Sequence, residues 1–102
     1  MTPIQYFLLA GLLLIGSHGL QAQKKKDQTT KARAAYAAGE YNVAIDLFRD
    51  AYNKVNDRDL KNELIFLIAE CYRITNQPDK AELRYKQAIQ REYPNPIIYL
   101  RY

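Results

Sequence analysis

The chain has 102 residues, enough for one small domain, and its single cysteine, Cys71, excludes an intramolecular disulfide. The net charge of +4 sits on one segment, because residues 1–22 carry no charged side chain, residues 23–33 hold five basic groups and one acidic group, and residues 34–102 hold ten of each. This distribution argues against a basic groove for nucleic acid, and with His18 as the only histidine we expect no enzyme, small-molecule substrate, metal site or cofactor.

An almost continuous apolar run occupies residues 4–16. As a helix it would reach roughly 20 Å at about 1.5 Å per residue, which is shorter than the roughly 30 Å hydrocarbon core of a bilayer. Ala22 is a suitable last residue before cleavage, so residues 1–22 are predicted to be a secretory signal peptide, although its first three residues contain no Lys or Arg. We therefore expect an exported protein whose mature chain begins at Gln23. A buried N-terminal helix and a retained membrane anchor are the alternatives.

Residues 23–29 form a basic N-terminal segment that contains Lys24, Lys25 and Lys26. We interpret it as a solvated tail, and contact with anionic lipid headgroups or an acidic partner is the alternative. An uncleaved leader together with these lysines would give a membrane-surface protein anchored by its N-terminal helix. That is the second functional hypothesis.

From residue 28 onward, apolar residues recur at three- and four-residue spacing, which predicts helices and no strand. Helices are predicted over residues 31–38, 41–55, 58–75 and 78–91, and a fifth begins at residue 96. Gly39 suits the turn after the first helix, and Asp57 can cap the third. Pro78 suits the first position of the fourth helix, and Asn95 can cap the fifth.

The third predicted helix is apolar on most of its surface, so neighbours are expected on more than one side. In the fourth helix the residues expected to face inward are Ala81, Leu83, Tyr85, Ala88 and Ile89. Cys71 is interpreted as a buried, inert thiol. The carboxylates Asp46, Asp50, Asp57, Asp59, Glu63 and Glu70 form no convincing acid/base pair and are assigned to solvated helix faces.

A small–aromatic–small pattern occurs twice, first as Ala44, Phe48 and Ala51 and again 37 residues later as Ala81, Tyr85 and Ala88. The same spacing relates Ala32 to Ala69 and Gly39 to Asn76. A fixed period of this size indicates a repeat architecture. With these residues the chain resembles the tetratricopeptide repeat (TPR) family, in which small residues sit where paired helices cross and aromatics fill the gaps between them.

The TPR resemblance covers about residues 28–102 and implies an all-α fold. It implies helix-turn-helix repeats that form a short right-handed solenoid, two repeats plus the start of a third. The repeat region, residues 30–102, then divides into units of about residues 28–57 and 58–94 and a partial unit, residues 95–102. Because two repeats are fewer than a stable stack usually contains, we expect the chain to be the N-terminal part of a longer polypeptide.

The resemblance implies a protein–protein interaction scaffold that binds an unidentified protein partner in the groove lined by the first helix of each pair. The residues expected there, called the candidate groove below, are Arg33, Tyr36, Glu63, Phe66, Glu70 and Arg73. Phe66 is the strongest candidate because it adds apolar area among charges, and its burial against the third repeat or the leader-side helix is the alternative. An RNA-binding repeat is a further alternative, against which Glu63 and Glu70 argue.

A leader followed at once by TPR-like units is also similar to the start of the OmpA-family outer-membrane-associated proteins of the Bacteroidota. Some of those proteins belong to the type IX secretion machinery. This resemblance implies a periplasmic, outer-membrane-associated location and contact with cell-envelope components. The 102 residues do not include the propeller or the peptidoglycan-binding domain of that family, so peptidoglycan binding is not assigned to them.

Overall fold

The structure, a computed structural model, describes residues 29–101; the predicted leader, most of the basic segment and Tyr102 lie outside the described residues. The described chain is all-helical, without a strand. Its helices are a first segment of residues 29–37, then α2 (Tyr41–Lys54), α3 (Arg58–Ile74), α4 (Pro78–Gln90) and α5 (Ile98–Arg101). Each predicted helix is therefore present. From residue 29 to residue 101, no helix is long and apolar enough to cross a bilayer.

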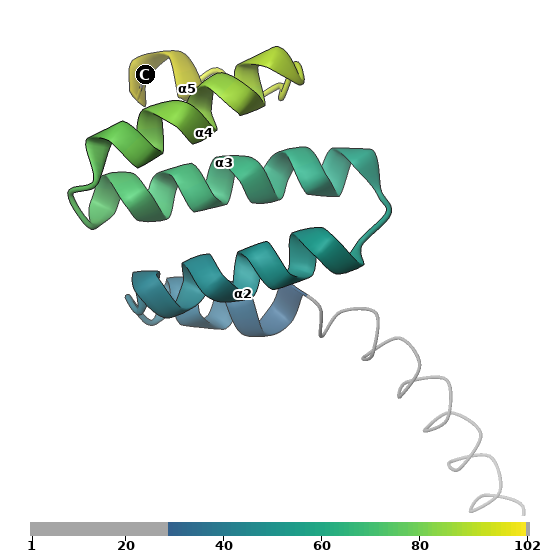
Figure 1. The fold of residues 1–102 in the computed structure, drawn as a ribbon, viewed down its shortest axis with the longest axis vertical. Coiled ribbons are helices and arrows are strands. Elements are labelled where there is room, and N and C mark those ends of the chain that lie inside the picture. The colour runs from purple at the N-terminus through teal and green to yellow at the C-terminus, as the bar shows by residue number, and fades with distance from the viewer. Residues whose placement is uncertain (1–28, 102) are drawn as a thin grey trace, which may run out of the picture.

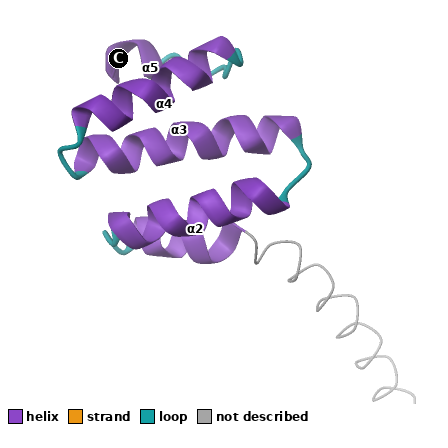
Figure 2. Ribbon diagram, viewed as in Figure 1, coloured by secondary structure: helices purple, strands orange, loops and turns teal. Residues whose placement is uncertain are grey.

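The helices follow one another through space in chain order. Helix α3 lies between α2 and α4 and packs against both, while the first segment lies beside α2 and α5 packs against α4 (Figure 1). The connections are short loops (Figure 2). The expectation that the third helix has neighbours on more than one side is confirmed, because nine of its residues are buried.

The residues predicted to start helices do so through local backbone contacts. The Asp57 carboxylate accepts the backbone N–H groups of Asp59 at 2.9 Å and Leu60 at 3.2 Å, and thereby caps α3. Pro78 opens α4 at the position where a missing N–H costs no hydrogen bond. The Asn95 side chain accepts the Ile97 N–H at 3.1 Å, just before α5 begins.

Three helices end in the same backbone motif, with one residue in the left-handed region. That residue is Gly39 (φ 80°), Asn76 (φ 59°) or Glu92 (φ 59°). The next residue donates its N–H to the carbonyl oxygen five residues earlier: Glu40 to Ala35 at 2.9 Å, Gln77 to Tyr72 at 2.8 Å and Tyr93 to Ala88 at 3.0 Å. This is the Schellman pattern, which satisfies the last carbonyls of a helix. Gly39 and Asn76 are 37 residues apart, so the sequence period also relates two helix ends.

Glu92 is the least suited of these three residues to a left-handed backbone, because its Cβ meets the carbonyl oxygen there. Replacing Glu92 by Gly is expected to raise the free energy of unfolding by about 1 kcal/mol, or roughly 4–8 °C in Tm. Thermal melting followed by circular dichroism measures this shift. The control Gln90→Gly, at the last helical residue of α4, should instead lower Tm; equal signs for the two variants would contradict the prediction.

The core holds both small–aromatic–small sets, whose residues are at most 3 % exposed: Ala44, Phe48, Ala51, Ala81, Tyr85 and Ala88. The expectation for Leu83 is wrong, because 58 % of this residue is exposed. Leu83 follows Ala81 by two residues, which places it about 200° around a helix of 3.6 residues per turn. It therefore points away from the side of α4 that carries Ala81, Tyr85 and Ala88.

Candidate functional site

The candidate groove residues come from the first segment and from α3. Arg33 donates from Nη2 to Glu63 Oε1 at 2.6 Å, an ion pair that links these two helices. Tyr36 is half-buried, and its ring meets the rings of Tyr41 and Phe48 edge-on at centroid distances of 5.4 and 6.3 Å. These contacts hold the first segment to α2 and α3.

Phe66 is only 7 % exposed, so it is buried as the alternative expected, but its aromatic neighbours belong to the second predicted repeat rather than to the third repeat or the leader-side helix. Its ring lies 5.1 Å from the Tyr93 ring and 6.1 Å from the Tyr85 ring, centroid to centroid. Aromatic pairs at such distances stabilise a fold beyond the area they bury. Phe66 therefore packs α3 against α4 and the loop after it, and a role in binding stays a prediction.

Glu70 is buried, 5 % exposed, which corrects the assignment of this carboxylate to a solvated face. One oxygen, Oε1, accepts from the Tyr85 hydroxyl at 2.6 Å and from Arg101 Nε at 3.2 Å, and the other accepts from Arg73 Nη2 at 2.9 Å. A carboxylate can be buried when charged donors compensate its lost hydration. Glu70 therefore joins α3, α4 and α5.

The charge state of this cluster follows from its contacts. Burial is the largest influence on the Glu70 pKa and raises it, but the hydrogen bonds from Arg73 and Tyr85 and the charges of Arg73 and Arg101 together lower it below its usual value. Burial, followed by the Glu70 carboxylate, raises the pKa of Tyr85, so its hydroxyl remains a donor. The hydrogen bond to Glu70 raises the pKa of Arg73. Glu70 is thus an anion near neutral pH.

The candidate groove residues therefore include two ion pairs and one buried aromatic ring. Arg33 pairs with Glu63, Arg73 pairs with Glu70, and Phe66 is buried. The side chains of Arg33, Glu63 and Arg73 remain partly exposed and offer charges of both signs. A partner would meet this charged rim rather than the Phe66 ring.

Cys71 is buried, as expected for a structural thiol. Burial, with a smaller contribution from the Glu70 charge, raises its pKa to about 11, so the thiol stays protonated near neutral pH. A protonated, buried thiol is a poor nucleophile. Over residues 29–101 no cluster of three or more His, Cys, Asp or Glu side chains could hold a metal ion.

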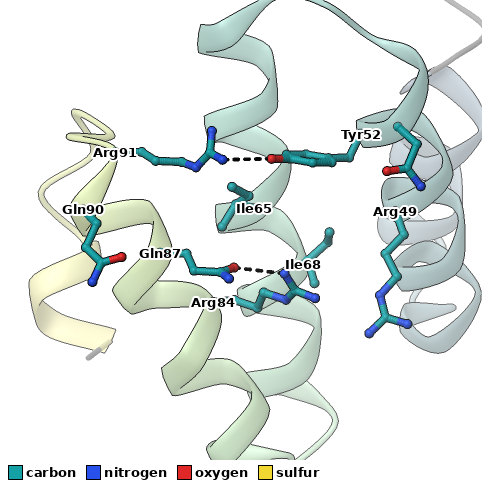
Figure 3. Close-up of a pocket in the computed structure, with 9 residues that line it drawn as sticks. Arg49, Tyr52, Ile65, Ile68, Arg84, Gln87, Gln90 and Arg91 are labelled. Atoms are coloured by element: carbon teal, nitrogen blue, oxygen red, sulfur yellow. Dashed lines mark hydrogen bonds between the residues drawn. The ribbon is translucent and has the colours of Figure 1, made fainter.

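A pocket of about 480 Å³ lies between α2, α3 and α4, and sequence reasoning did not identify it. Its lining is Arg49, Tyr52 and Asn53 from α2, Ile65 and Ile68 from α3, and Arg84, Gln87, Gln90 and Arg91 from α4 and its C-cap (Figure 3). In α2, Tyr52 and Asn53 follow Arg49 by three and four residues, and in α4, Gln87 and Gln90 follow Arg84 in steps of three, so each helix directs one stripe into the pocket. The periodicity of each helix contained this signal, but only the packing of α2 and α4 on either side of α3 brings the two stripes to one pocket.

Comparison of the chain with known protein families, with curated proteins and with solved structures gave no match.

Proposed function

We propose that this chain is an exported protein–protein interaction scaffold made of TPR-like repeats, located in the periplasm in association with the outer membrane. In this proposal the first segment with α2 and α3 with α4 are two copies of one helix-turn-helix unit. Helix α5 begins a third unit, and the units stack as a short right-handed solenoid. The partner is a protein that binds at the candidate groove.

The observation that carries the proposal is a 37-residue spacing that recurs in the sequence, in the buried core and at the helix ends. A period of 37 residues relates the small–aromatic–small sets in the sequence, and the members of both sets are buried. It also relates Gly39 to Asn76, which end their helices in the same left-handed conformation. Such repeated units present an extended surface, and that surface is what repeat proteins use for binding.

Photo-crosslinking in the source cells tests this proposal. A photoreactive phenylalanine analogue placed at Arg33, on the rim of the candidate groove, is expected to give one discrete protein adduct. The same analogue at Leu83, which is also exposed but lies on α4, is the matched control and should give none. Equal adducts at both positions, or none at Arg33, would reject the groove as the binding surface.

The exported location is checked on the same sample. The protein recovered from the cell envelope is expected to begin at Gln23, which N-terminal sequencing determines directly. Recovery from the membrane with Met1 intact would instead favour the membrane-surface hypothesis, in which the leader stays as an anchor.

A further inference from the structure

The pocket between α2, α3 and α4 contains three positive charges and no negative one. Arg49, Arg84 and Arg91 line it, and no carboxylate belongs to its lining. The ion pairs formed within residues 29–101 involve other side chains: Arg33 with Glu63, Lys54 with Asp50, Arg73 and Arg101 with Glu70, and Lys86 with Glu82. The three guanidinium groups therefore line one pocket and form no ion pair with a carboxylate of the described residues.

Neutral partners hold these guanidinium groups in place. Arg84 Nη1 donates to Gln87 Oε1 at 2.9 Å, and Arg91 Nη2 donates to the Tyr52 hydroxyl at 3.1 Å across the pocket (Figure 3). Arg49 Nη2 donates to the Tyr72 hydroxyl. Each arginine has five N–H donors in a fixed fork, so several donors on each group stay available to a ligand. A charged fork already held in position loses less entropy on binding.

The rest of the lining is chemically suited to a peptide. Ile65 and Ile68, from α3, form an apolar floor. The side-chain amides of Gln87, Gln90 and Asn53 can both donate to and accept from peptide groups. The volume of about 480 Å³ falls within the usual range for a ligand site, of which a single inorganic anion would fill a small part.

The same lining is poorly suited to nucleic acid. Single strands are bound by stacking bases on aromatic rings, and Tyr52 is the only aromatic residue of the pocket. Lys61 Nζ lies 4.5 Å from the centroid of the Tyr52 ring, so one face of that ring is already covered. The Tyr52 hydroxyl is also engaged by Arg91.

We propose that this pocket binds an acidic peptide segment of a partner protein, with carboxylate side chains on Arg49, Arg84 and Arg91 and the chain over Ile65 and Ile68. The pocket is separate from the candidate groove, because Ile65 and Ile68 lie on roughly the opposite side of α3 from Phe66 and Glu70 at about 100° per residue. The inference therefore goes beyond the proposed function, and either one can fail without the other.

Fluorescence anisotropy with a labelled hexaglutamate peptide and the 102-residue chain tests the proposal at about 50 mM salt, where charge interactions are weakly screened. Hexaglutamate is expected to bind, and hexaglutamine is not. Because charge-assisted hydrogen bonds are among the stronger ones, Arg49→Gln and Arg84→Gln should each weaken binding about tenfold or more. Both arginines are at least partly exposed, so the folded state, checked by Tm, should persist.

The charge-matched control is Lys31→Gln, which removes one exposed positive charge from the first segment, away from the pocket. It should leave hexaglutamate affinity within about twofold, since only long-range attraction changes. Failure of hexaglutamate to bind, or equal losses in Lys31→Gln and Arg84→Gln, would overturn the proposal. So would displacement of the peptide by inorganic phosphate at equal concentration, or tighter binding of a single-stranded oligonucleotide.

Discussion

Replacing Glu70 by Ala is expected to lower the free energy of unfolding by about 3–5 kcal/mol, because the change removes the acceptor of a buried ionic cluster. Arg73, Tyr85 and Arg101 all donate hydrogen bonds to this carboxylate. The bond from Arg101 connects α5 to Glu70 of α3. Urea denaturation followed by circular dichroism measures the loss. A loss below about 1 kcal/mol would show that the attraction within the cluster only offsets the cost of desolvating its charges.

The buried hydroxyl of Tyr85 provides the control for this prediction. Tyr85→Phe removes one donor of the cluster and keeps the ring that packs against Phe66. If the two groups stabilise each other, the double variant should lose less than the sum of the single losses, by about 0.5–3 kcal/mol. Strict additivity would mean that the 2.6 Å hydrogen bond contributes nothing beyond packing.

The cluster also predicts how stability depends on pH. The folded pKa of Glu70 is lowered from 4.5, so the unfolded chain binds the proton more readily. The stabilisation is then fully present above about pH 4.5 and is lost as pH falls through the lowered folded pKa. Glu70→Gln cannot titrate, so its deficit relative to the unmodified chain should shrink in that window. A constant deficit would contradict the assignment.

The helices could be predicted because their signals are local. Asp57, Pro78 and Asn95 act on backbone groups within three residues, and Gly39 needs only its own freedom of φ. The two core sets could be predicted for a similar reason, since their members are three or four residues apart on one helix face. The predicted bounds of α2, α3 and α4 consequently agree with the structure to one residue at each end.

Side chains that meet across helices could not be predicted. The neighbours that bury Glu70 come from α4 and α5, 15 and 31 residues away, and a single helix pattern shows Glu70 only as one charge among others. The arginines of the pocket likewise come from α2 and from α4 with its C-cap. Leu83 was predicted to face inward because it is apolar, but its angular position around α4 places it on the exposed side.

Replacing Phe66 by Ala is expected to lower the free energy of unfolding by about 3–5 kcal/mol, the usual result of removing a buried aromatic ring. The ring lies against Tyr85 and Tyr93, so its loss leaves a cavity between α3 and the segment that follows α4. Urea denaturation measures the change. The matched control is Tyr99→Ala on α5, which is 69 % exposed and should change stability by about 0.5 kcal/mol or less.

The remaining question is whether Phe66 only packs or also binds, and Phe66→Leu separates these roles. Leu keeps an apolar side chain in the buried site, so the fold should lose much less stability than in Phe66→Ala. Because the Phe66 ring is 7 % exposed, a partner on the rim of the candidate groove gains little from it. The crosslink formed from Arg33 should therefore persist in folded Phe66→Leu. Its disappearance while Tm is maintained would assign Phe66 a direct part in binding.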